Sequence, residues 1–76
     1  MRKLLRKTSS KEWLAADGQL TLDVDQAVIV RDVAHALHLC RKHQLKGMEM
    51  VLKFDSDEYD VVLKIGDAWV NPERNP

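Results

Sequence analysis

The sequence predicts a small α+β domain in which one main helix packs on one face of a sheet that ends in an antiparallel meander. Two observations carry this prediction. Apolar and polar residues alternate over residues 48–54 and again over 59–65, as they do in half-buried strands. Between residues 27 and 44 the apolar residues instead recur at helical spacing. We therefore expect, in order, a short helix, a strand, the main helix and the meander.

The first helix is expected shortly before Gly18. Ser9 and Glu12 have the spacing of a capping box, in which each side chain satisfies a free backbone N–H of the first turn. Trp13-Leu14-Ala15-Ala16 continue the helix, and Gly18 is suited to the left-handed conformation that ends one. Leu4 and Leu5 suit a backward extension of this helix into the basic N-terminal arm, residues 1–11.

A strand is expected next, because Leu20, Leu22 and Val24 alternate with polar residues. The main helix then begins at Asp25 or Asp32 and ends near Gly47. The alternative for Val28-Ile29-Val30 is a second strand, since all three residues are β-branched. The turn before it lacks the glycine that such hairpins prefer, so we favour the helix. One face of the helix is apolar and consists of Ile29, Val30, Val33, Ala36, Leu37 and Cys40. Leu39 falls on the polar side and is a candidate partner contact.

The C-terminal hairpin has a definite expected register. With residues 55–58 as the loop, Glu49 faces Lys64, Val51 faces Val62, and Lys53 faces Asp60. A two-residue loop would instead place Asp55 against Asp60. Each cross-strand pair contributes about 0.2–1 kcal/mol, and the charge pairs favour the four-residue loop. A second tight turn at Gly66-Asp67 then returns residues 68–70 along the previous strand.

This register leaves an apolar cluster on the sheet face away from the main helix: Val51, Val62 and Trp69. It is either covered by the N-terminal helix or is an interaction surface, and aromatic residues are enriched at such surfaces. The whole chain, residues 1–76, is expected to be one domain, with the arm at 1–11, a folded body at 12–71 and a tail at 72–76. A domain of this size buries only about 60% of its unfolded surface, so self-association would help to stabilise it.

Charge is unevenly distributed along a chain whose formal net charge is zero. The arm holds five cations and no acid, whereas residues 12–76 hold seven cations against twelve acids. A basic arm is typical of nucleic-acid or anionic-lipid contacts, and it is also typical of a frayed end that folds back on an acidic body. The candidate nucleic-acid contacts are Arg2, Lys3, Arg6, Lys7 and Lys11. The body lacks the basic stripe and the stacking aromatics that RNA-binding sheets carry.

No residues with catalytic, metal-binding or cofactor-binding spacing stand out. His35, His38 and His43 share the main helix with Cys40, but Cys40 belongs to its apolar face, and His35 and His43 are about 12 Å apart along the axis. The acidic residues 55–60 lack the glycine and the terminal glutamate of a calcium loop. Three scattered glycines form no phosphate-binding loop. We expect a non-enzymatic chain without a metal or cofactor.

The location expected from the sequence is cytoplasmic. No apolar run reaches the roughly 18 residues of a membrane span, and the basic start is not followed by the apolar stretch of a signal peptide. The single cysteine agrees with a reducing compartment.

Two functions follow as hypotheses. The first is a protein-interaction or regulatory module that binds another protein or a second copy of itself through the outer sheet face or a strand edge. The alternative is a nucleic-acid-binding regulator that uses the arm.

Overall fold

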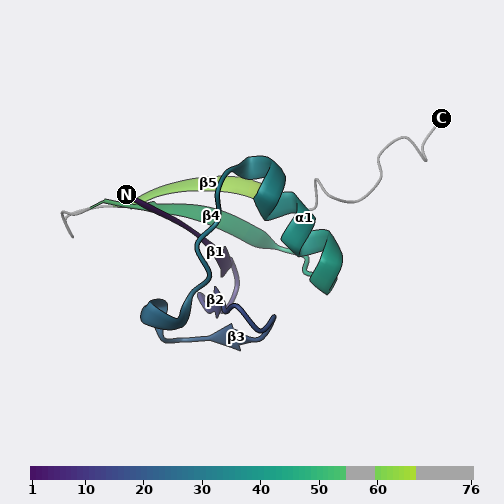
Figure 1. The fold of residues 1–76 in the computed structure, drawn as a ribbon. Coiled ribbons are helices and arrows are strands. Elements are labelled where there is room, and N and C mark those ends of the chain that lie inside the picture. The colour runs from purple at the N-terminus through teal and green to yellow at the C-terminus, as the bar shows by residue number, and fades with distance from the viewer. Residues whose placement is uncertain (55–59, 67–76) are drawn as a thin grey trace.

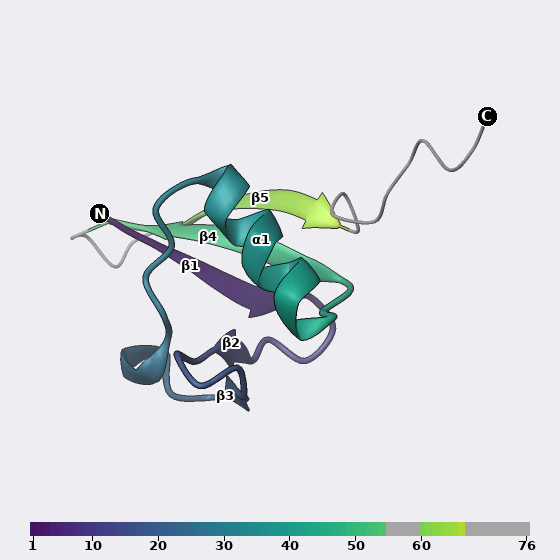
Figure 2. The same ribbon diagram turned by 45° about the vertical axis from the view of Figure 1, so that its right-hand side comes forward.

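The computed structural model describes residues 1–54 and 60–66 and shows an α+β fold built on one antiparallel sheet (Figure 1). The strands are β1 (Arg2–Lys7), β2 (Trp13–Leu14), β3 (Leu20–Thr21), β4 (Met48–Lys53) and β5 (Asp60–Gly66), joined by the 3-10 helix η1 (Val24–Gln26) and the helix α1 (Val33–His43). The order across the sheet is β3-β2-β1-β4-β5. Helix α1 lies on one face of the sheet. The segment of β2, β3 and η1 lies beyond β1, away from β4 and β5 (Figure 2). The α+β class is confirmed.

The N-terminal residues form the central strand, so the predicted N-terminal helix is wrong. Strand β1 pairs with β4 over its whole length and with β2 at Arg6. A turn then joins β1 to β2, with hydrogen bonds from the Lys7 amide to the Glu12 carbonyl and from the Lys11 amide to the Lys7 carbonyl. Lys11 has a φ of 64°, which no α-helix contains. The physical reason is burial on both sides: Leu4 and Leu5 point to opposite faces of a strand, and a strand places both in a core.

Two hydrophobic cores lie on the two faces of the sheet. The first, under α1, contains Leu5, Leu14, Val30, Ala36, Cys40, Met48 and Met50. The second contains Leu4, Trp13 and Val51, with Val24 and Ala27 packed against them. Neighbours along a strand, such as Leu4 and Leu5, enter different cores because strand side chains alternate between faces.

Between Leu20 and the start of α1 the structure differs from the sequence prediction in two ways: the strand is shorter, and the residues from 27 to 32 are not helical. Strand β3 stops at Thr21, and Leu22, which alternation placed in the core, is 76% exposed. Residues 27–32 run extended rather than helical: the Val28 amide donates to the Leu14 carbonyl, and the Val30 amide donates to the Lys3 carbonyl. Their β-branched side chains favour extended backbone, and this backbone hydrogen bonding holds it there.

Helix α1 begins at the second of the two predicted starts. The Asp32 side chain caps it by accepting a hydrogen bond from the His35 amide (2.8 Å). The helix ends at His43, because Gln44 takes the left-handed conformation ahead of Gly47. Val30, Ala36 and Cys40 of the predicted apolar face are buried, whereas Ile29 and Val33 are exposed.

Gly18 has the predicted left-handed backbone (φ 88°), but it lies in the turn between β2 and β3. A Cβ atom there would approach the His43 ring to 2.7 Å, so both the backbone and the space favour glycine.

The predicted hairpin register is confirmed. Glu49 faces Lys64, Val51 faces Val62, and Lys53 faces Asp60. Lys53 and Asp60 also form an ion pair, with Nζ and Oδ2 3.2 Å apart. The loop residues 55–58, Tyr59 and the predicted third strand at 68–70 lie outside the described residues.

Candidate functional site

The most exposed apolar surface of the sheet lies along β5. Val61, Val62 and Leu63 are 36%, 40% and 39% exposed. Val61 and Leu63 face the α1 side, because they stand opposite Leu52 and Met50, which pack under the helix. Val62 faces the other side, opposite Val51. Strand β5 therefore presents apolar side chains to solvent on both faces of the sheet.

The exposure of β5 follows from the sizes of the elements. A helix is about 10–12 Å across and strands are about 4.8 Å apart, so one helix covers roughly two strands. Helix α1 packs against β4, and β5 lies beyond it at the end of the sheet (Figures 1 and 2). Within residues 1–54 and 60–66, only β4 pairs with β5.

Other exposed apolar residues occur on the chain near the α1 side of the sheet. Ile29 is exposed before the start of α1, Val33 is exposed at its first residue, and Phe54 is exposed just after β4. The sequence alternation groups Phe54 with Met50 and Leu52, but β4 ends at Lys53, so Phe54 lies just beyond the strand. These three side chains add exposed apolar surface outside β5.

Of the cluster predicted on the outer sheet face (Val51, Val62 and Trp69), Val51 is buried and Val62 is exposed. Val51 is fully buried, because Trp13 and Leu4 pack over it. The expected cover thus exists, but it comes from strands β1 and β2 rather than from a helix. Val62 stays exposed, and Trp69 lies outside the described residues.

Leu39 does not stand out as a surface residue. It is half-buried and packs against the core under α1. The helical wheel placed it among polar residues, but its side chain packs against the same core as Ala36 and Cys40.

The five cations proposed as nucleic-acid contacts are distributed over both faces of β1 and the turn after it. Lys3 and Lys7 donate to the carbonyls of Arg31 (3.0 Å) and Lys46 (2.8 Å). Arg6 and Lys11 pair with Glu49. Arg2 is exposed on β1. The structure does not bring these five side chains together as one arm.

Glu49 is the centre of a polar cluster that the sequence did not reveal. Its side chain is 3% exposed. It accepts hydrogen bonds from Arg6 Nε (2.6 Å) and Thr8 Oγ1 (3.1 Å), and Lys11 Nζ lies 3.8 Å away. The Arg6 guanidinium also lies over the Trp13 ring, 5.4 Å from its centre, so it joins the carboxylate to the second core.

The cluster lowers the pKa of Glu49. Burial by itself raises the pKa of a carboxyl group, but the hydrogen bond and charge of Arg6, with the Thr8 hydroxyl and Lys11, outweigh it and lower the pKa from its ordinary 4.5. The Glu49 carboxylate is surrounded by Arg6, Thr8 and Lys11 of the same chain. This arrangement is that of a structural ion pair rather than of a general acid or base.

A pH dependence follows from this pKa. A group whose pKa is lower in the folded state stabilises the fold above its unfolded pKa and loses that effect as the pH falls through the folded pKa. We expect the stability of the chain to decrease below about pH 4.5. The Glu49→Gln variant should show a smaller decrease, because its amide does not titrate. Urea unfolding at a series of pH values would measure both slopes, and equal slopes would contradict the assignment.

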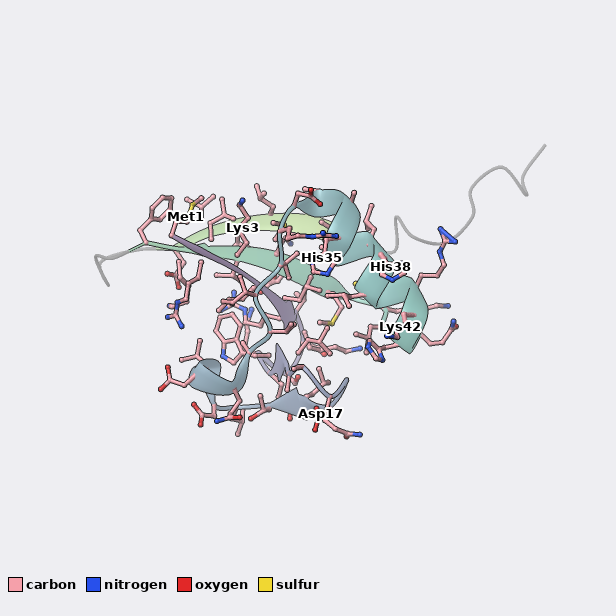
Figure 3. All side chains as sticks on the ribbon, in the orientation of Figure 1. Met1, Lys3, Asp17, His35, His38 and Lys42 are labelled. Atoms are coloured by element: carbon pink, nitrogen blue, oxygen red, sulfur yellow. The ribbon has the colours of Figure 1, made fainter. Side chains whose placement is uncertain are left out.

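His35 and His38 follow one another along α1 (Figure 3), and His43 is the last residue of the helix. His35 Nδ1 accepts a hydrogen bond from the Arg31 amide (3.0 Å), and His43 packs against Gly18. Cys40 is buried in the core under α1. Within the described part of the chain, no three His, Cys, Asp or Glu side chains form a group that would hold a metal ion. That the chain binds no metal stays a prediction.

Comparison with protein-family models, with curated proteins and with solved structures found no match. None of the helices in residues 1–54 and 60–66 has the length and apolar character that a membrane crossing needs.

Proposed function

We propose that this chain is a small non-enzymatic protein-interaction or regulatory module that binds through strand β5. One observation carries the proposal: β5 is the last strand of the described sheet, and three consecutive residues of it, 61–63, are each more than a third exposed. An edge strand offers backbone N–H and C=O groups to an incoming strand, and its side chains supply specificity. The Val62 side chain adds an apolar contact on the outer sheet face.

The nucleic-acid alternative has less support. Base stacking beside the basic strand would need an accessible aromatic side chain there, and Trp13, the aromatic residue next to Arg6, is 8% exposed beneath Arg6 and Lys53. Arg6 and Lys11 already face the Glu49 carboxylate. Binding a phosphate through Arg6 would leave Glu49 buried beside an anion.

A positional cross-linking experiment in the native host tests the proposal. A photo-reactive phenylalanine analogue placed at position 63 should give a discrete protein adduct, identified by mass spectrometry. The same analogue at position 22 is the matched control, because Leu22 is more exposed and follows β3 at the opposite edge of the sheet. If positions 61, 62 and 63 give no adduct beyond that of position 22, β5 is not a binding strand.

A further inference from the structure

The residues at the two ends of the exposed part of β5 carry opposite charges. The strand reads Asp60-Val61-Val62-Leu63-Lys64, with an acid two residues before Val62 and a base two residues after it. Residues two apart on a strand share a face, so Asp60, Val62 and Lys64 form one row on the outer sheet face. When a second copy of this row runs antiparallel to the first, the acid of each copy faces the base of the other.

We infer that the partner of β5 is a second copy of this chain, which adds its own β5 antiparallel to the first with Val62 on the two-fold axis. This inference rests on the proposed function and names its partner. It takes the place of the predicted return of residues 68–70 along β5, because both arrangements would use the same strand edge. In this register Asp60 faces Lys64 of the second copy at both ends, and the two Val62 side chains face each other. The result is a continuous sheet through both copies, with an isologous interface.

Symmetry and charge together select this register. Two strands that extend one sheet around a two-fold axis keep their faces, so each row must meet the same row of the other copy. Centring the axis on Val61 sets Asp60 against Val62, and centring it on Leu63 sets Val62 against Lys64. Only the register centred on Val62 pairs both charges and leaves no charge opposite a valine.

The α1 face of the sheet agrees with the same register. Val61 then faces Leu63 of the second copy, and Leu63 faces its Val61. These two residues lie beside Leu52 and Met50 of their own copy, so the apolar rows continue from one core across the interface. Both α1 helices lie on the same side of the joined sheet, because the axis is perpendicular to it.

The existing partner of Asp60 is compatible with the second pairing. Lys53 Nζ lies 3.2 Å from Asp60 Oδ2 and 3.3 Å from Oδ1. A carboxylate accepts about four hydrogen bonds, so it can receive a lysine from each side. Glu49, opposite Lys64, is already paired with Arg6, so Glu49 does not compete with the second copy for the Lys64 ammonium.

The test uses two charge-reversed full-length chains, Asp60→Lys and Lys64→Asp. Each alone sets like charges against each other at both ends of the interface, so each should self-associate at least tenfold more weakly than wild type. An equimolar mixture restores two opposite-charge pairs and should form a one-to-one heterodimer. Sedimentation velocity over a concentration series measures all three, and circular dichroism confirms that each variant is folded. Asp25→Lys and Lys46→Asp are the matched controls, since both residues are exposed outside β5, and both should self-associate like wild type.

A second variant reports the register without changing a charge. Facing residues of antiparallel strands have Cα atoms about 4.5–5.5 Å apart, within the range that a disulfide spans. Val62→Cys should therefore form a disulfide-linked dimer on mild oxidation, whereas Val61→Cys and Leu63→Cys should do so only when the two are mixed. Wild-type chain that remains monomeric throughout, or variants that associate unchanged, would overturn the inference. In that event a heterologous adduct from position 63 in the cross-linking experiment would leave the proposed function standing.

Discussion

Replacing Leu5 by alanine should lower the free energy of unfolding by about 2–5 kcal/mol, the usual cost of truncating a fully buried leucine. Leu5 is 0% exposed and packs under α1 from the central strand. Small domains of this length have only about 3–5 kcal/mol of stability from their cores, so much of the population should be unfolded at 25 °C. Leu4→Ala should have a similar effect, because Leu4 is equally buried on the opposite face.

Thermal and urea unfolding followed by circular dichroism would measure the effect. Leu22→Ala is the control, since Leu22 is 76% exposed and substitutions at such sites usually change stability by less than about 0.5 kcal/mol. Both β1 variants would remain as stable as wild type if the first eleven residues were a frayed arm. That outcome would contradict β1 as the central strand.

Replacing Arg6 by alanine should destabilise the chain by about 3–5 kcal/mol, because it leaves a buried carboxylate without its main partner. Glu49 would keep only Thr8 and the more distant Lys11. The same change removes the cation–π contact with Trp13. Arg2→Ala, an exposed arginine on the same face of the same strand, is the matched control and should have little effect.

Adding Glu49→Gln to Arg6→Ala should recover part of the lost stability, since the remaining group is neutral and costs less to bury. A double-mutant cycle in urea measures this coupling between the two residues. If the two single losses simply add, the carboxylate is not the reason that Arg6 stabilises the fold. In that case the contact with Trp13 would account for the Arg6 effect.

Local sequence patterns were sufficient to predict an interaction where the two interacting residues are close in the chain. The register of β4 and β5 followed from alternation and cross-strand charge, because the two strands are joined by a short connection. Asp32 was one of two predicted starts for α1, and its side chain acts on the next turn of the same helix. The exposure of β5 was not predicted, because alternation shows which face a residue occupies but not whether a helix covers it.

The sequence by itself determined the α+β class, the C-terminal hairpin and the buried face of α1 at Ala36 and Cys40. Only the tertiary structure decided the fate of the N-terminus. Arg-Lys-Leu-Leu-Arg-Lys is compatible with a helix and with a strand, and the choice depends on pairing with β4, more than forty residues away. That pairing buries Leu4 and Leu5 in separate cores and brings Arg6 to Glu49. The energy that selects the strand comes from those long-range contacts, which local propensity does not contain.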